Sequence, residues 1–252
     1  MKRLYIFFIS ASFLFASCSV PTPTTASVTA TSDSEPDLFA TPWEDRSPFK
    51  SGLVASEQSI LSELPHASVY HIEFNIAEDL YHISGMEEVR YTNAEDVPLD
   101  QVQLRLFPNI LGGEMTVSNL TADGESITPR LELQDSLLIV PFAAPLAPGQ
   151  SIILRMDFAI TVPQSVELNY GMLAYFDDVL ALAHTYPMIA VYDDAGWNAE
   201  IPAQSGDVAY ADTSFFLVKI TAPKNLRVVT AGHVIHSSEN GEMQTVQIAS
   251  GP

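Results

Sequence analysis

A strict alternation of apolar residues near the middle of the chain is the feature that most constrains its fold. Between Ile152 and Val162, an apolar side chain occupies every second position for six consecutive places. No helical period produces this spacing, whereas a β-strand sends alternate side chains to opposite faces of a sheet. Shorter runs repeat the pattern at 70–76 and 102–106. The pattern therefore predicts half-buried β-strands.

Turn signals separate these runs and indicate how the strands are joined. They include Asp123-Gly124, the segment from Pro145 to Gly149, and Asn240-Gly241. A chain of 252 residues with 47% hydrophobic residues can form one substantial core or two small ones. We expect an all-β fold, an antiparallel β-sandwich or pair of saddle-shaped sheets made of about a dozen short strands.

The N-terminus has the three parts of an export signal. Lys2 and Arg3 precede an apolar run from Leu4 to Phe15, and small residues follow. The segment Phe15-Ala16-Ser17-Cys18 resembles a bacterial lipobox, in which the cysteine becomes the lipidated N-terminus. We expect residues 1–17 to be a lipoprotein signal peptide and Cys18, the single cysteine, to be the lipidation site; a buried thiol is the alternative. The mature protein is then an extracytoplasmic, membrane-anchored lipoprotein.

Composition divides the remainder of the chain into three parts. Residues 18–50 are rich in Ser, Thr and Pro and are expected to form a disordered tether after the lipidated cysteine. Residues 51–67 form a short lead-in, partly helical from Val54 to Leu64 with Pro65 as its stop. Residues 68–252 form the β-domain. The net charge of -20 argues against nucleic-acid partners, because the surface repels phosphate backbones.

The chain lacks the usual sequence patterns of hydrolytic catalysis. None of its six histidines begins an HExxH zinc motif, and no Gly-x-Ser-x-Gly motif is present. His233 and His236 lie three residues apart on a predicted strand and should face opposite sides, which argues against joint metal binding. His71 and His82 are expected on solvated strand faces. We expect no catalytic residue and no metal ligand in this chain.

A long segment from Ala183 to Asp212 combines aromatic and acidic residues without a clear strand period, which suits a binding loop. Adjacent acidic residues usually mark a solvated turn, and aromatic residues in a loop often pack onto the sheet beneath. A calcium site is an alternative, with oxygen ligands drawn from Asp193, Asp194, Asp207 and Asp212. The candidate residues for a substrate wall or binding loop are Tyr186, Tyr192, Asp193, Asp194, Trp197 and Asp207.

Six segments in a fixed order resemble the N-terminal β-domain of the aminopeptidase N-like zinc metallopeptidases, which are zinc peptidases of the gluzincin kind. They are YHIEFNI, HISGMEEVRYTN, LDQVQLRLFPN, MTVSNLTADG, LAPGQSIILRMDFAITVP and FFLVKITAP, and the resemblance covers residues 68–252. The family's HExxH helix and GxMEN-like loop are both missing; Gly112-Gly113-Glu114-Met115 stands in the wrong order to replace the loop.

The resemblance implies a scaffold domain that forms one wall of a peptidase cleft. Its partners would be a catalytic metallopeptidase domain, in cis or in trans, and a peptide substrate. Zinc is expected only in a downstream catalytic domain, so this chain holds no cofactor. The ending VQIASGP breaks off after a predicted strand, which suggests a truncated gene, a fragment or a split catalytic partner. The alternative hypothesis is a stand-alone binding lipoprotein that captures a glycan, a peptide or calcium through residues 183–212.

Overall fold

The computed structural model describes residues 37–167, 169–202 and 207–252. The expected signal peptide, Cys18 and residues 19–36 of the expected tether lie outside these ranges. In the part of the chain that the structure describes, no helix is long and apolar enough to cross a membrane.

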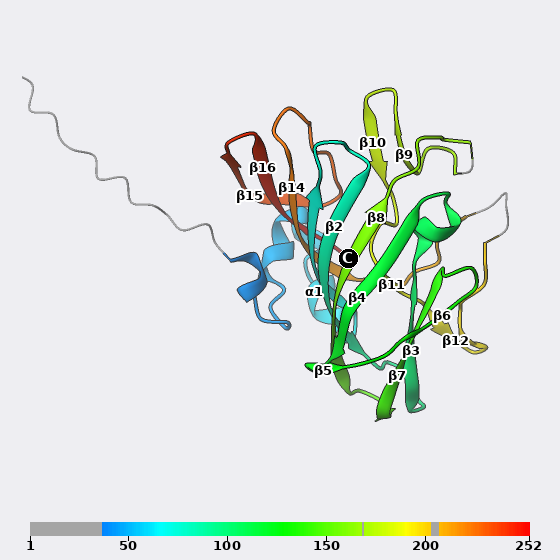
Figure 1. The fold of residues 1–252 in the computed structure, drawn as a ribbon. Coiled ribbons are helices and arrows are strands. Elements are labelled where there is room, and N and C mark those ends of the chain that lie inside the picture. Colours follow the sequence, from blue (N-terminus) through cyan, green and yellow to red (C-terminus); the bar gives the residue numbers. More distant parts are fainter. Residues whose placement is uncertain (1–36, 168, 203–206) are drawn as a thin grey trace, which may run out of the picture. The chain divides into compact units, whose positions relative to one another are not determined.

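The larger layer is a sheet with eight strands among the described residues (Figure 1). They are β1 (Val69–Ile76), β2 (His82–Thr92), β4 (Glu114–Ala122), β5 (Glu125–Ser126), β8 (Ser151–Thr161), β14 (Phe215–Pro223), β15 (His233–Asn240) and β16 (Met243–Ser250). The strand order is β15-β16-β14-β1-β2-β8-β4-β5. Neighbours pair antiparallel except β1 and β14, which run parallel with Val69 opposite Phe215.

The smaller layer is an antiparallel sheet in the order β11-β3-β7-β6. Its strands are β3 (Leu99–Arg105), β6 (Arg130–Glu132), β7 (Leu137–Leu146) and β11 (Met188–Ile189), and the turn η4 (Phe107–Ile110) follows β3. Two hairpins belong to neither of these sheets. They are β9 (Leu173–Phe176) with β10 (Val179–Leu182), and β12 (Tyr192–Asp193) with β13 (Gly196–Trp197). Buried residues from both layers, such as Leu104 and Leu154, share one core. The expected all-β fold is confirmed.

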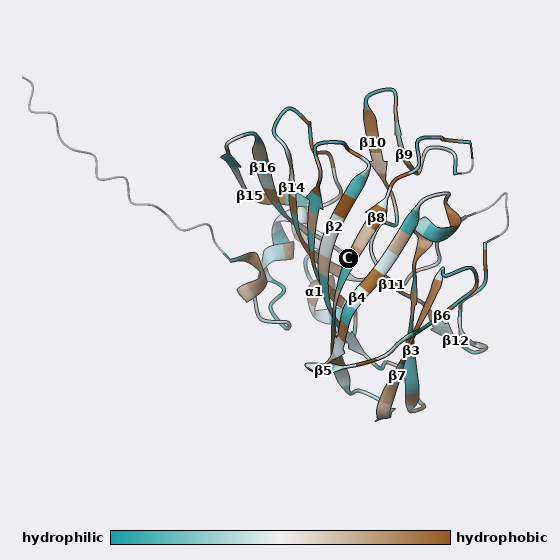
Figure 2. Cartoon of the chain, viewed as in Figure 1, coloured by the Kyte–Doolittle hydropathy of each residue, from teal (hydrophilic) through white to brown (hydrophobic). Residues whose placement is uncertain are grey.

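Strand β8 shows why the alternation predicted this fold. Leu154, Met156, Phe158 and Ile160 are at most 3% exposed, whereas Arg155 and Ala159 between them are exposed. Alternating hydropathy is also visible along the neighbouring strand β4 (Figure 2). One face of the larger sheet, here called the inner face, therefore turns towards the smaller sheet. The opposite face is the outer face.

Gly85 sits where two strands and an aromatic ring approach most closely. It lies in β2, opposite Phe74 of β1 and Phe158 of β8. A Cβ atom at this position would lie 2.1 Å from Phe158 Cζ and 2.6 Å from the Glu73 carbonyl oxygen. The Phe158 ring occupies that space and packs edge-on against Phe74, with ring centroids 5.5 Å apart. Only glycine fits this position without displacing the core.

The prediction of a disordered tether up to residue 50 is wrong for residues 37–50. The 3₁₀ turns η1 (Leu38–Ala40) and η2 (Ser47–Gly52) pack on the outer face of the larger sheet, where Leu38 and Phe49 join Phe215 in a second buried cluster. We call residues 37–53 the strap. A few large apolar side chains anchor it, although the average composition of the segment is polar.

The lead-in is less helical than expected. The predicted helix from Val54 to Leu64 is split into a 3₁₀ turn, η3 (Ala55–Glu57), and the four-residue helix α1 (Ile60–Glu63). Leu61 is buried in the same cluster as the strap residues. Neither short element has a side-chain hydrogen bond at its N-cap, so packing on the sheet holds this segment in place.

Candidate functional site

The predicted binding loop is more structured than its sequence suggested. The structure describes residues 183–202 and 207–212 of it. Its first part crosses the fold and adds β11 to the edge of the smaller sheet, where Met188 lies opposite Arg105. The hairpin β12–β13 follows and brings Tyr192 opposite Trp197. Strands of two residues are too short to show an alternation of apolar and polar residues in the sequence.

Tyr186 packs against aromatic residues of the larger sheet. Its ring packs edge-on against Tyr70, with centroids 5.4 Å apart, and against Phe216, with centroids 5.7 Å apart. Tyr70 is itself buried, and its hydroxyl accepts a hydrogen bond from the Ile189 backbone N–H at 3.1 Å. Burial raises the pKa of Tyr186 above its ordinary value, so its hydroxyl stays protonated at neutral pH.

Tyr192 and Trp197 of the loop also pack inward, whereas Tyr210 is 59% exposed. Trp197 meets Tyr192 edge-on, with ring centroids 5.3 Å apart, and lies 6.1 Å from Tyr91 of β2. Tyr186, Tyr192 and Trp197 are each half-buried against the main core. The alternative that they pack onto the sheet therefore describes Tyr192 and Trp197 best.

The acidic residues of the loop do not converge. Asp193 caps the β12–β13 turn, where its Oδ1 accepts a hydrogen bond from the Ala195 backbone N–H at 2.8 Å. Asp194 and Asp207 are exposed. Within the described ranges, no group of three or more His, Cys, Asp or Glu side chains could hold a metal ion. The calcium alternative thus gains no support from the placement of these residues.

An apolar groove opens beside Tyr186 on the inner face of the larger sheet. Its volume is ≈ 770 Å³. The floor is formed by β1, β14 and β16, and includes Ile72, Val218 and Ile248. One wall is the chain from 178 to 186, and the other is the loop from 226 to 231. The smaller sheet does not cover this part of the inner face.

The rim of the groove carries apolar side chains that are largely in water. Val179 and Val229, which face the groove from its two walls, are 62% and 82% exposed. Phe176, on the same hairpin as Val179, is 58% exposed. Exposed apolar surface around an apolar groove usually marks a binding surface. Sequence reasoning missed this groove because its floor and walls come from distant segments.

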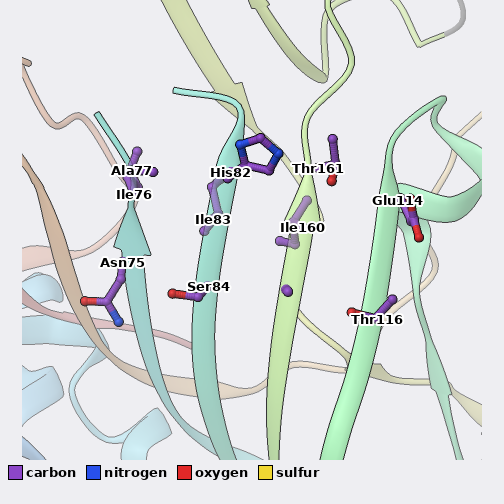
Figure 3. Close-up of a pocket in the computed structure, with 11 residues that line it drawn as sticks. Asn75, Ile76, Ala77, His82, Ile83, Ser84, Glu114, Thr116, Ile160 and Thr161 are labelled. Carbon is purple, nitrogen blue, oxygen red and sulfur yellow. The ribbon is translucent and has the colours of Figure 1, made fainter. Parts of the chain in front are cut away.

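A second hollow, of ≈ 470 Å³, lies near one end of the outer face (Figure 3). Asn75, Ser84 and Thr116 lie in one row across it, with the small residue Ala159 between the last two. These side chains offer hydrogen-bond donors and acceptors on a nearly flat strand surface. Only the register of four strands brings them together, so no local pattern in the sequence could have revealed the hollow.

His82 lies at the edge of this hollow and is exposed, as expected. Its Nδ1 lies 2.6 Å from Asp79 Oδ2. The hydrogen bond from His82 is the main cause that lowers the pKa of Asp79 to about 2.

Two other expectations about histidines are wrong. His71 is 2% exposed, because the strap covers the polar face on which it was expected to be solvated. His233 lies opposite Ala249 and His236 opposite Gln247, so both face the same side of β15. A β-bulge between Val234 and His236 shifts the alternation by one residue.

Glu87 is a buried carboxyl group that sequence reasoning did not single out. It lies on the inner face of β2, opposite Ile72 and Met156, and is 0% exposed. Neither carboxyl oxygen has a hydrogen-bond partner among the described residues. Burial raises the pKa of Glu87 well above its ordinary value, so the group is held in its neutral form.

Comparison with known proteins found similar solved structures. No protein-family model and no curated protein matches the chain. Among solved structures, the M1 zinc metallopeptidase from Deinococcus radiodurans matches 73% of this chain and 39% of its own, with 18% identity and a TM-score of 0.47. A mutant form of a two-domain M1 zinc metallopeptidase bound to L-tryptophan also matches 73% of this chain and 39% of its own, with 18% identity and a TM-score of 0.48.

These solved structures are M1 zinc metallopeptidases, and the chain is similar to them in fold. It spans about two fifths of the length of these solved structures, whose matched share is 39%. The activity and partners of a whole peptidase are therefore considered below as proposals for this chain.

Proposed function

We propose that this chain is the N-terminal wall domain of an extracytoplasmic zinc aminopeptidase-like protein. It acts as a scaffold and forms one side of a cleft in which a catalytic domain, in cis or in trans, hydrolyses peptides. A lipid on Cys18 attaches the protein to the membrane. The order of the six sequence segments and the pair of layered sheets support this proposal.

The open apolar groove is the observation that carries the proposal. A domain that worked alone in water would be expected to cover such a surface, since large exposed apolar patches are uncommon on monomeric proteins. Here Val179 and Val229 remain exposed around a groove of ≈ 770 Å³. Tyr186, from the predicted loop, lines the same groove. A catalytic domain seated over the groove would bury this surface and bring Tyr186 to the interface.

The proposal assigns no chemical step to this chain. Within residues 37–167, 169–202 and 207–252, no group of three or more His, Cys, Asp or Glu side chains that could hold a metal ion is found. Zinc and the catalytic groups belong to the partner domain. The role left for this chain is to position that domain and to limit access to its cleft.

Binding to the catalytic region tests the proposal. The DNA downstream of the codon for Pro252, and neighbouring genes, should encode a region containing HExxH. The full chain should bind this region, and Val229→Asp should weaken binding at least tenfold, because a carboxylate buried at the interface has no partner. Val97→Asp is the matched control: Val97 is 46% exposed, lies in the turn between β2 and β3, and does not line the groove.

Calorimetric titration of the catalytic region with each variant gives the affinities. Equal weakening by Val229→Asp and Val97→Asp would show that the groove is not the contact surface. Failure of the wild-type chain to bind would contradict the wall-domain proposal itself.

One observation favours the second candidate, a stand-alone binding lipoprotein. A smaller hollow of ≈ 350 Å³ is also lined by Tyr186 and includes Asp212 from the end of the loop. Asp212 is exposed, and partial desolvation raises the pKa of its carboxyl group. An aromatic ring beside a partly desolvated carboxyl group suits the capture of a peptide amine or a sugar. A natural stop codon after Pro252, with no peptidase gene nearby, would favour this candidate.

A further inference from the structure

The strap is held on the outer face by a cluster separate from the core between the sheets. Phe49 is 1% exposed, and its ring lies 4.8 Å from that of Phe215 of β14. The guanidinium carbon of Arg46 lies 4.3 Å above the same Phe215 ring. This cluster has seven buried residues among those described, and none of them belongs to the main core. The strap can therefore detach without opening the contact between the two sheets.

His71 lies beneath the strap and is the polar group that this packing desolvates. Trp43 stacks on the imidazole with ring centroids 4.0 Å apart and an angle of 12°, and Phe39 lies 5.3 Å away. Neither ring nitrogen of His71 has a hydrogen-bond partner among the described residues. A neutral imidazole tolerates this position, whereas an imidazolium loses its hydration. The cation–π attraction between the imidazolium and the Trp43 ring offsets only part of the lost hydration free energy.

Charged groups around His71 come from both neighbouring elements. Glu88 lies opposite His71 on β2, and its Oε1 accepts a hydrogen bond from Arg155 Nη1 at 2.7 Å. Asp37, at the start of the strap, accepts a hydrogen bond from the Phe39 N–H at 3.1 Å. Both carboxylates favour the protonated imidazole, but burial outweighs them and lowers the pKa of His71 to about 4.

The remaining nearby charges are already engaged. Arg90 of β2 pairs with Glu44 of the strap at 3.3 Å. Glu73, two residues after His71 on the same face, lies 3.9 Å from Lys219 of β14. The carboxylates of Glu44 and Glu73 are therefore each paired with a basic side chain other than His71.

We propose that the strap is an acid-released latch: protonation of His71 lifts residues 37–53 from the outer face while the two sheets stay together. The docked state binds fewer protons than the released state. Docking is therefore strongest above about pH 6.5, the ordinary titration range of histidine, and weakens as the pH falls towards about 4. Release uncovers Phe215 and Leu217, which form an apolar surface on β14.

Hydrogen exchange of the full chain tests the latch. Backbone amides of the strap, such as Phe49 N–H bonded to the Arg46 carbonyl, should lose at least tenfold of their protection between about pH 7 and about pH 4, after correction for intrinsic rates. Amides of β8 should keep theirs. The chain has two tryptophans, so a Trp197→Phe background leaves Trp43 as the single reporter for acrylamide quenching, which should increase over the same range.

Two variants separate the latch from general effects of acid. His71→Phe keeps an aromatic ring for stacking but cannot be protonated, so its strap should remain protected at both pH values. His82→Phe changes an exposed histidine and should keep the wild-type response.

Three results would overturn the proposal. The wild-type strap could stay equally protected at both pH values, His71→Phe could lose protection as the wild type does, or β8 could lose protection in step with the strap.

Discussion

Replacing Glu87 by methionine should stabilise the protein, and increasingly so as the pH rises. The carboxyl group is 0% exposed and has no hydrogen-bond partner for either oxygen among the described residues. Methionine has a similar length and volume, so Ile72 and Met156 opposite keep their contacts. Removing an unsatisfied buried polar group of this kind is worth about 1–3 kcal/mol in the free energy of unfolding.

The pH dependence follows from the direction of the pKa shift. Burial raises the pKa of Glu87 in the folded state well above its ordinary value. Above about pH 4.3 the unfolded chain loses this proton while the folded chain keeps it. The contribution of Glu87 to stability is therefore fully present below that pH and is lost as the pH rises, by up to about 1.4 kcal/mol per pH unit. Glu87→Met lacks this loss.

Urea unfolding of the full chain and of Glu87→Met at about pH 4.5, 6 and 7.5 measures both effects. The difference in unfolding free energy should favour the variant and should grow from the first pH to the last. Glu88→Gln is the control on the same strand: its side chain faces outward in an ion pair with Arg155, so the change should cost less than about 1 kcal/mol. A difference that stays constant with pH would refute the reasoning, because it would mean that Glu87 titrates alike in both states.

Two further predictions concern single positions. Gly85→Ala should destabilise the protein by about 2 kcal/mol or more, because its Cβ would lie 2.1 Å from Phe158 Cζ. Ser84→Ala, on the outer face, is the control and should change the free energy of unfolding by less than about 0.5 kcal/mol. Thermal unfolding measures both, and equal effects would contradict the close approach at Gly85. Cys18→Ala should abolish acylation and leave unprocessed precursor in the aqueous phase of a detergent partition, and processing like that of the wild type would disprove the lipoprotein hypothesis.

The sequence predicted the parts of the fold in which one rule decides the outcome. Alternation fixed β8, because each of its inward positions meets a continuous core. The parallel pairing of β1 with β14 could not be predicted, since nothing near Val69 in the sequence indicates a partner near Phe215. The strap was hidden for a different reason: a few aromatic side chains bind it to the sheet, whereas composition describes only the average of the segment.

The candidate site shows the same limit. Tyr186 was selected from its loop and does line the groove, but most of the groove comes from strands that seemed merely structural. His71 was expected in solvent because its strand position is polar, and the strap, itself unforeseen, buries it. The bulge in β15 moves His233 and His236 to one side, although strict alternation separates them. Each miss arises where a distant segment or an irregular backbone overrides a local pattern.

Glu87 and His71 lie on adjacent strands but face opposite sides of the larger sheet, and their effects on stability have opposite signs. Acid removes the cost of Glu87, because the folded core already holds that carboxyl group in its neutral form. Acid destabilises the docked strap, because docking desolvates the imidazolium that His71 forms at low pH. The two costs fall on different structures: Glu87 lies between the sheets, whereas His71 lies between the sheet and the strap. Between about pH 6.5 and about pH 4.3, the ordinary titration ranges of the two side chains, the core therefore tightens while the strap loosens. This opposition favours release of the strap before the domain unfolds.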